Sequence, residues 1–489
     1  MTAIAGATGV IPQERRLDLS TKLFYGFGSV AFGVKDNGFS YLLLLFYNQV
    51  LGLPATQVGL ALMIALLFDA FVDPMIGQFS DNLRTRWGRR HPLMYAAALP
   101  MGIFYVALWN PPHWNHQALF YYLVAMAILI RGVVSFYEVP SSALAAEFST
   151  SYDERSILLS YRYFFAWVGG LAIQVLAFAV LLTPDATHKL GQLNPVGYGH
   201  YGIVASLVIF VSILVSTAGT HKEIPRLMPP PPRRHLTPGQ IIGEMRESLS
   251  NRSFLFLLGS GVTAAMATGL VASLNGYFNT FFWGFTARQI SILTGGVFLS
   301  AIMALSVAPR LSKRFGKRTT SVALTILSVV VGLTPLFLRL GGLMPPNGSP
   351  QLLGIIFCTS IVGVTFTIVA TTMGSSMVAD VVEAAELKTG RRSEGLFFAA
   401  AAFIAKAVSG FGILAATALI TAIHLKAGSN PATIPPEIPR NLALVYCPTI
   451  IGLHAIGLSL LFGYRINRAS HDETLRQLAA EAEQAVHTA

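Results

Sequence analysis

About twelve apolar runs of roughly twenty residues or more follow one another along the chain, and they most constrain its fold. A helix needs about twenty apolar residues to cross the hydrocarbon core of a bilayer. Only 12% of the 489 residues are charged, whereas a soluble domain carries about 25%. The sequence therefore predicts an all-α polytopic membrane protein with twelve transmembrane helices. The predicted spans are 23–49, 56–80, 92–110, 117–146, 157–183, 197–219, 254–283, 289–309, 319–339, 351–379, 395–424 and 441–463.

The longest polar interval separates the sixth and seventh spans and contains the proline run 229–232. Such a run favours a stiff polyproline conformation that cannot cross a membrane as a helix. It divides the chain into two halves of six helices each. The predicted domains are an N-terminal six-helix bundle over 1–219, a central linker over 220–252, a C-terminal six-helix bundle over 253–465 and a tail over 466–489.

Lysine and arginine gather in alternate connections and predict the orientation of the chain. They lie after the second span, after the eighth span and in the central linker, whereas the loops 50–55 and 110–116 contain none. The positive-inside rule places such basic connections in the cytoplasm. Both termini and the linker are therefore predicted to be cytoplasmic, in a multi-pass protein of the inner membrane. Because Arg15, Arg16 and Lys22 precede the first span, we expect a retained helix rather than a cleaved signal.

Several other classes are disfavoured by composition. The net charge of +11 comes from basic residues beside apolar spans, so we expect no nucleic-acid partner. Cys358 and Cys447 both lie in apolar stretches, so no disulfide framework or zinc site is expected. A polytopic membrane enzyme is the least favoured function, because no catalytic motif is present. Of the histidines, only His424 and His454 lie near apolar runs, at no metal-binding spacing.

Asp69 and Asp73 stand inside the second apolar span. Their spacing of four residues places both carboxylates on one face of a helix. Because a charge at bilayer depth costs about 2.5–3.5 kcal/mol, this face is expected to look into protein or a water-filled cavity. The pair is either a structural element bound to an Arg or Lys of a neighbouring helix, or a site that takes up and releases a cation. We favour the cation site.

A basic pentapeptide occurs at the same place in both halves, as Arg-Trp-Gly-Arg-Arg over 86–90 and Arg-Phe-Gly-Lys-Arg over 314–318. Repeated halves that meet around a midplane site are typical of many secondary transporters. The first copy follows Gly-Gln-Phe-Ser-Asp81 and is similar to the loop signature of the major facilitator superfamily. It predicts a cytoplasmic gate latch formed by Asp81, Arg89 and Arg90. The alternative reading, anchoring to anionic lipid, is compatible with this latch.

Four segments in order resemble the glycoside–pentoside–hexuronide:cation symporters, the melibiose permease group of that superfamily. They are Tyr25-Gly-Phe-Gly leading to Lys35-Asp36, Asp69-Ala-Phe-Val-Asp73-Pro-Met-Ile-Gly with its basic loop, Glu138-Val-Pro-Ser-Ser-Ala-Leu with Tyr161-Arg-Tyr-Phe-Phe, and Met377-Val-Ala-Asp leading to Lys406. The matches run from about residue 22 to about residue 410. The resemblance implies the major facilitator fold and cation-coupled transport by alternating access.

The resemblance also implies a cation site. In that family, the acids that match Asp69 and Asp73 hold the coupling sodium, lithium or proton, and the lysine that matches Lys406 lies near them. Val72 stands where the melibiose permease has an asparagine, which removes one oxygen ligand that sodium would use. The coupling ion is a proton or sodium, with the proton slightly favoured. The aspartates are metal ligands only if sodium is the ion, and no other cofactor is expected.

Substrate contacts follow from the same resemblance and from helix position. Residues that match Asp36, Glu138 and Arg162 contact the sugar in that family. For Asn275, the sequence supports substrate binding and hydrogen bonding to a neighbouring helix equally well. Ser142 stands where the melibiose permease has a sugar-facing tryptophan. The candidate substrate contacts are Lys35, Asp36, Glu138, Arg162 and Asn275.

We therefore predict a secondary active transporter that couples a cation to a sugar, glycoside or related small solute. The alternative is a transporter or flippase of amphipathic, lysolipid-like substrates, which the family also contains. We expect a monomer whose partners are the bilayer and the small-molecule substrate. Arg131 in the fourth span either snorkels or pairs with a nearby acid. Charged residues from Asp380 to Glu394 are predicted to form a cytoplasmic network.

Overall fold

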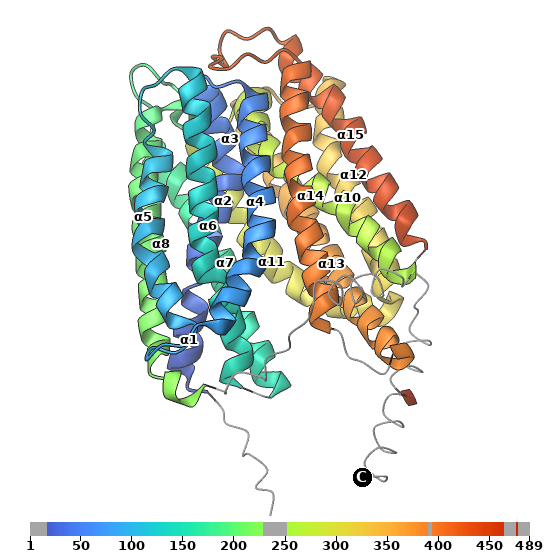
Figure 1. The fold of residues 1–489 in the computed structure, drawn as a ribbon. Helices are drawn as coiled ribbons and strands as arrows, with labels where there is room; N and C mark the ends of the chain where they lie inside the picture. The colour runs from blue at the N-terminus through green and yellow to red at the C-terminus, as the bar shows by residue number, and fades with distance from the viewer. Residues whose placement is uncertain (1–16, 150, 228–251, 390–393, 464–475, 478–489) are drawn as a thin grey trace, which may run out of the picture.

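The computed structural model describes residues 17–149, 151–227, 252–389, 394–463 and 476–477, and helices dominate these residues (Figure 1). The first span is divided into α1 (Leu19–Phe27), α2 (Val30–Asn37), η1 (Gly38–Leu42), α3 (Leu43–Leu45) and η2 (Phe46–Val50). The N-terminal half continues with α4 (Ala55–Asn82), α5 (His91–Trp109), α6 (His116–Phe148), α7 (Tyr152–Leu176), η3 (Ala177–Leu181) and α8 (Pro195–His221). The C-terminal half contains α10 (Arg252–Tyr277), η6 (Phe278–Phe282), α11 (Ala287–Phe315), α12 (Lys317–Leu340), α13 (Pro350–Thr389), α14 (Glu394–Ala422) and α15 (Glu437–Leu461).

This order of elements confirms the predicted all-α membrane fold. Within the described residues, ten helices are long and apolar enough to cross a membrane, and α14 contributes the shorter apolar stretch Val408–Ala422. The divided first segment occupies the remaining predicted span. The linker residues 228–251, most of the predicted tail, and Arg391 and Arg392 of the predicted charge network lie outside the described residues.

Several helices extend beyond the apolar spans predicted for them. α11 continues to Phe315 and α12 begins at Lys317, so only Gly316 separates the two helices. Arg310, Lys313 and Arg314 therefore lie on the last turns of α11, and their predicted placement in a connection is wrong. Hydropathy marks the edge of the apolar surface, whereas the i to i−4 hydrogen bonds of a helix continue into polar sequence.

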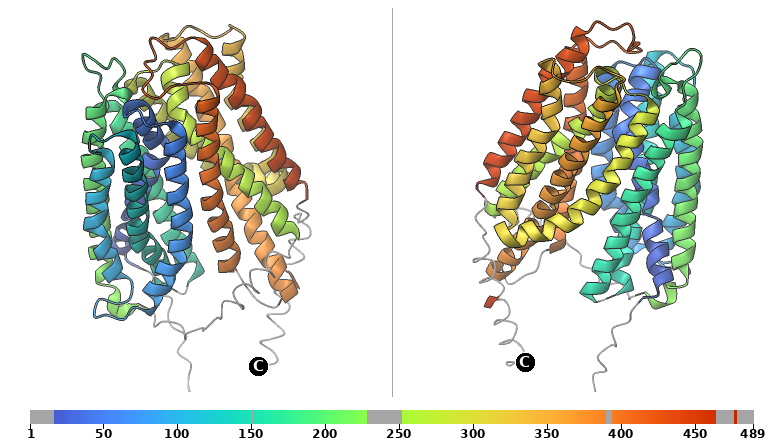
Figure 2. Two further views of the ribbon diagram at one scale, coloured as in Figure 1. Left: turned by 45° about the horizontal axis from the view of Figure 1, so that its top comes forward. Right: turned by 180° about the vertical axis from the view of Figure 1, so that it is seen from behind.

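The two halves stand side by side, with the N-terminal half from blue to green and the C-terminal half from yellow-green to red (Figure 1). Two seams join them. At one seam α4 packs against α14, and at the other α7 and η3 pack against α11, as the two views of Figure 2 show. α4 also packs along α6 within its own half. A polar group on α4 can therefore meet partners from both halves.

The face opposite the end of α8 and the start of α10 carries a corner that is repeated in the two halves (Figure 1). We call the side with those two helix ends the linker face. The π-helical turns η2 and η6 end the first and seventh spans, and Gly52 and Gly284 follow them at the same spacing. Both glycines adopt left-handed φ values of 80° and 63°, which residues with a Cβ atom rarely adopt. In each corner the next amide donates to a carbonyl oxygen of the π turn, at 2.9 Å and 2.8 Å. The repeat extends to structure that hydropathy alone does not predict.

Hydrogen bonds at these corners join the halves. The Tyr277 hydroxyl donates to Asn48 Oδ1 at 2.8 Å. The Gln49 side chain bonds to two backbone groups of the connection between α14 and α15, at 3.3 Å and 3.0 Å. Gln192, between α7 and α8, donates to the Phe285 carbonyl oxygen at 2.8 Å. We call Asn48, Gln49, Gln192 and Tyr277 the outer layer, and it holds the halves together on the face opposite the linker.

Candidate cation and substrate site

The aspartate pair lies on α4 where this helix packs against α6 and α14. Asp69 has 3% of its side chain exposed and Asp73 has 23%. The two residues are four positions apart, which is about one helical turn, so they lie on the same face of α4. The pair is therefore enclosed by protein from both halves, with Asp73 the more accessible member.

Two basic side chains and one hydroxyl contact the pair. From α6, Arg131 Nη1 lies 3.0 Å from Asp69 Oδ2, and Ser135 Oγ lies 3.1 Å from Asp69 Oδ1 and 2.6 Å from Asp73 Oδ1. From α14, Lys406 Nζ lies 2.6 Å from Asp73 Oδ2 and 3.5 Å from Asp69 Oδ2. All four carboxylate oxygens therefore have a donor group nearby. The structure places an ion pair with a neighbouring helix at Asp69, and it brings Lys406 to both acids.

A cavity of about 230 Å³ opens beside Asp69 between the two halves. Lys35 and Asp36 lie at its edge and pair with each other, with Nζ and Oδ1 2.7 Å apart. Glu138 also lines it; no described residue forms an ion pair in direct contact with its carboxylate, but its charge interacts with that of Lys406. Polar groups from α10 and α14, including Ser273 and Lys406, complete the wall. Three of the predicted substrate contacts thus face one polar cavity.

The charged side chains that line this cavity balance when every group is ionised: Asp36, Asp69 and Glu138 face Lys35, Arg131 and Lys406. Beside the cavity, Asp73 adds one negative charge and pairs with Lys406. The buried Arg162 guanidinium, which bonds to the Glu138 carbonyl oxygen, adds one positive charge. These described groups therefore leave no net charge, as burial in a membrane favours.

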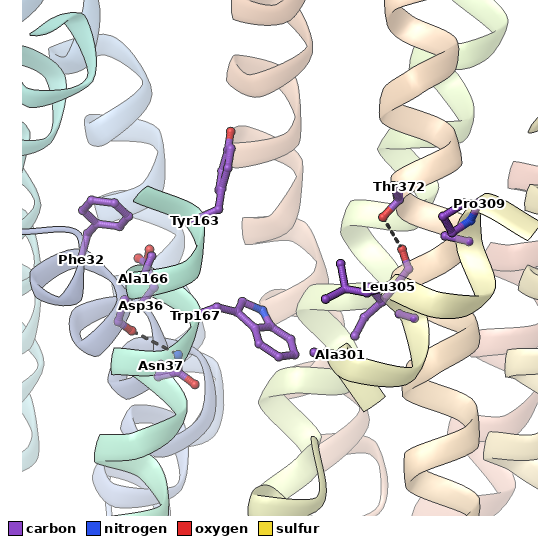
Figure 3. A pocket seen from close by; sticks show the side chains of 14 residues that line it. Phe32, Asp36, Asn37, Tyr163, Ala166, Trp167, Ala301, Leu305, Pro309 and Thr372 are labelled. Atoms are coloured by element: carbon purple, nitrogen blue, oxygen red, sulfur yellow. Dashed lines mark hydrogen bonds between the residues drawn. The ribbon is translucent and has the colours of Figure 1, made fainter. Parts of the chain in front are cut away.

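A second cavity, of about 670 Å³, is also lined by Asp36. Figure 3 shows Trp167 on α7 pointing across this space toward Ala301 and Leu305 on α11, with Tyr163 also on the α7 side. Its lining is mostly apolar, and two of its polar side chains bond to nearby backbone carbonyl oxygens, at 3.1 Å and 2.8 Å. A charged cavity and a mostly apolar cavity therefore share Asp36 as a lining residue.

Arg162 and Asn275 line neither of these two cavities. The Arg162 guanidinium donates to Ser141 Oγ at 2.9 Å and to the Glu138 carbonyl oxygen at 3.2 Å, and it lies 4.8 Å from the centre of the Phe32 ring. Asn275 accepts a hydrogen bond from the residue one turn later in its own segment, at 2.9 Å. A direct substrate contact by either residue stays a prediction.

The predicted latch residues come together at the linker face of the N-terminal half. Arg90 contacts Asp81, and its Nε lies 2.7 Å from Glu147 Oε1. Arg89 Nη2 lies 2.8 Å from the same oxygen. Glu147, near the end of α6, is buried and was not predicted from the sequence. These contacts tie α4, the start of α5 and the end of α6 within one half, and their role as a gate latch stays a prediction.

The second basic pentapeptide makes the corresponding contact in the C-terminal half. Lys317 Nζ lies 2.5 Å from Asp380 Oδ1, a residue of α13. α13 is the fourth spanning segment of its half, as α6 is of the first half. The pentapeptide repeat thus pairs with an acid on the same segment in both halves.

Two residues of the site were not predicted as such from the sequence: Arg131 was not assigned to the cation site, and Ser135 was not singled out. Each stands alone in an apolar helix, and a single serine there has no chemical signature. Their signal lies in spacing with Glu138, because positions i, i+4 and i+7 share one helix face. That face of α6 points at α4, which only the packing reveals.

A family model described as MFS/sugar transport protein matches residues 24–468. The chain belongs to this family. The relatives that it resembles are transporters. An uncharacterised symporter of Synechocystis is 26% identical over 95% of this chain and 97% of its own length. A putative glycoside/cation symporter of Escherichia coli is 24% identical, over 95% of each chain. The isoprimeverose transporter of Lactiplantibacillus pentosus is 24% identical, over 92% of this chain and 89% of its own.

Solved structures agree on the fold of this MFS/sugar transport protein. A bacterial homologue of the human lysosomal transporter Spinster superposes with a TM-score of 0.58 at 13% identity, over 94% of this chain and 97% of that one. A D-xylose–proton symporter superposes with a TM-score of 0.58 at 15% identity, over 88% and 96%. The major facilitator fold and a transport function are thus established, and the alternative of a membrane enzyme is set aside.

Proposed function

We propose that this protein is a cation-coupled symporter of a sugar-like small solute, working by alternating access. The observation that carries the proposal is the position of Lys406, whose ammonium group from one half lies between two carboxylates of the other. A cation that binds the pair competes with Lys406 and so changes a contact between the halves. Such competition is a physical link between ion binding and the movement of the two bundles.

Asp69, Asp73 and Lys406 form the proposed cation site, with the proton as the favoured ion. Ser135 has one hydroxyl hydrogen, yet its Oγ lies within 3.1 Å of both carboxylates and 2.9 Å from the Arg131 carbonyl oxygen. A proton on Asp73 would let that carboxyl donate to Ser135 while Ser135 donates to Asp69. All three groups would then be satisfied without further ligands.

The polar cavity is the proposed substrate site. The Glu138 carboxylate lines the cavity, interacts with Lys406 only through its charge, and can accept hydrogen bonds from sugar hydroxyl groups. Lys35 and Asp36 supply a donor and an acceptor at the other edge. Arg162 supports Glu138 through its carbonyl oxygen. The named relatives include a putative glycoside symporter and an isoprimeverose transporter, which supports a sugar-like substrate.

We further propose that the linker face is cytoplasmic, in the inner membrane, and that the protein acts as a monomer. Basic residues gather on that face, as the positive-inside rule requires. Since the outer layer joins the halves on the opposite face, the described arrangement corresponds to an inward-facing state.

Transport into proteoliposomes tests this function. Purified protein is reconstituted and offered radiolabelled hexoses, pentoses, hexuronides and simple glycosides, with an imposed pH gradient or an imposed sodium gradient. We expect at least one of these solutes to accumulate above its equilibrium level under the pH gradient. Failure of every solute under both gradients would refute cation-coupled sugar symport.

A second candidate, transport of amphipathic substrates, is favoured by the apolar cavity that adjoins the polar one. Its volume of about 670 Å³ lies in the range of ligand pockets, about 300–1,000 Å³. Quenching of tryptophan fluorescence by 4-nitrophenyl glycosides tests it, because Trp167 lines this cavity. Tighter binding than the parent sugar, with the quenching lost in Trp167→Phe, would place an apolar group there. Equal affinities would exclude this use of the cavity.

A further inference from the structure

Arg131 differs from Lys406 in how firmly it is held at the aspartate pair. Arg131 and Asp69 are both more than nine-tenths buried, and both belong to the N-terminal half. The guanidinium also lies 5.2 Å from the centre of the Phe39 ring, a favourable position for a cation. Lys406 belongs to the other half, and its side chain is 36% exposed. Separation of the halves would remove Lys406 from the pair and leave Arg131 in place.

The guanidinium of Arg131, a positive charge fixed to the chain, therefore already occupies the position beside Asp69. A metal ion that displaced Lys406 from this pair would still lie within a few ångströms of the Arg131 guanidinium, which already holds Asp69 Oδ2 in an ion pair. Like charges at that distance repel strongly where water is excluded. Sodium also prefers a shell of several oxygen ligands, as hard cations do. Apart from the aspartates, Ser135 supplies the one side-chain oxygen in contact with both acids among the described residues.

We propose that Arg131 is the residue that determines ion specificity: a tethered cation that keeps sodium and lithium out of the aspartate pair. This inference rests on the proposed cation site and deepens it. With Arg131 removed, the four carboxylate oxygens and Ser135 Oγ become a set of oxygen ligands around an uncompensated negative charge. The same site then fits an alkali-metal ion.

Thermal unfolding of the purified full-length protein, with the metal ion alone as probe, tests the proposal. A ligand that binds only the folded state raises the melting temperature. The melting temperature of the unchanged protein is expected to be the same in sodium, lithium and choline chloride at equal ionic strength. Arg131→Ala is expected to melt several degrees higher in sodium or lithium than in choline, with a saturable dependence on the ion.

Two further variants keep the test decisive. Arg131→Gln preserves much of the side-chain volume and replaces Arg131→Ala if truncation prevents folding, with the same expected response. Arg131→Lys retains the positive charge and is expected to stay insensitive to sodium. Arg339→Gln is the matched control and is expected not to respond, because the Arg339 guanidinium, in the last turn of α12, bonds to a loop carbonyl oxygen at 2.6 Å and not to either aspartate.

The outcomes separate this proposal from the proposed function. Stabilisation of the unchanged protein by sodium would overturn the role of Arg131 while leaving symport intact, with sodium as the coupling ion. Lack of any sodium or lithium response in both Arg131→Ala and Arg131→Gln would also overturn it. Failure of the proposed function would appear instead in the transport assay, as absence of accumulation under either gradient, whatever the melting data show.

Discussion

Lys406 Nζ lies 2.6 Å from Asp73 Oδ2 and so joins α14 of the C-terminal half to α4 of the N-terminal half. The contact crosses the seam that must open and close in alternating access. We expect a charge pair at such a seam to have two roles. Lys406 neutralises a carboxylate when the site is empty, and binding of a cation to that carboxylate breaks a contact with the other half.

Lys406→Ala is expected to abolish accumulation of substrate while leaving the protein folded. Because the lysine side chain is 36% exposed, water compensates part of the lost pair, and we expect a loss of about 1–2 kcal/mol of stability. Uptake assays and melting curves measure the two effects. Lys406→Arg, which keeps the charge, is the control. Full coupling in Lys406→Ala would reduce this residue to a structural one.

Tyr277→Phe is expected to loosen the outer layer, because it removes the hydrogen bond from the Tyr277 hydroxyl to Asn48. One such bond contributes about 1 kcal/mol, so the population opened on that face should rise about fivefold. The measure is the rate at which an impermeant thiol reagent labels Ser40→Cys, a position in the polar cavity. The two native cysteines are replaced by serine in this background.

Tyr122→Phe provides the matched control for that experiment. It removes a hydroxyl that donates to the Ala107 carbonyl oxygen at 2.8 Å, within the N-terminal half. Labelling should then stay at the rate of the unchanged protein. Equal acceleration by both variants would show a general loss of packing and contradict a specific role for the outer layer.

The latch should be more sensitive at Glu147 than at Asp81. The Glu147 side chain is 7% exposed and receives both Arg89 and Arg90, whereas that of Asp81 is 58% exposed. Glu147→Gln leaves buried arginine charge without its partner, so we expect a loss of about 3 kcal/mol, against less than about 1 kcal/mol for Asp81→Asn. Denaturation in detergent compares the two variants. A larger effect of Asp81→Asn would show that the buried pair is not the core of the latch.

Much of the fold was predictable because hydropathy reports it directly. Long apolar runs with basic flanks indicate spanning helices, and all predicted spans contain helices. The ends of the helices were not predictable in this way, since α11 and α13 continue through charged sequence to Phe315 and Thr389. Likewise, the division of the first span into five pieces depends on packing against its neighbours, which local composition does not encode.

Only the charged residues of the candidate site could be predicted from the sequence. A carboxylate pair in an apolar helix is conspicuous by its energetic cost, so Asp69 and Asp73 could be singled out. Ser135 carries no such cost, and its contact with both acids arises from the packing of α6 on α4. Arg131 was conspicuous, but the choice between an interfacial position and an ion pair needed the structure.

Reporter fusions test the orientation. A fusion at Pro231 in the central linker and a fusion after the C-terminal tail should both report the cytoplasm, because the basic connections flank both positions. An alkaline phosphatase and green fluorescent protein pair gives opposite readouts for the two sides. A periplasmic signal from either fusion would contradict the predicted number of spans.

Asp73→Asn is expected to abolish concentrative uptake and to retain exchange of substrate down its gradient. An amide has the shape of the carboxyl group but cannot take up and release a proton, and it leaves the substrate cavity lined as before. Asp69→Asn should act in the same way or weaken substrate binding, because it also leaves the buried Arg131 unpaired. Proteoliposomes driven first by a pH gradient and then by a sodium gradient decide between the ions. Uptake that follows sodium alone would overturn the proton reading, and undiminished accumulation by Asp73→Asn would remove the pair from the mechanism.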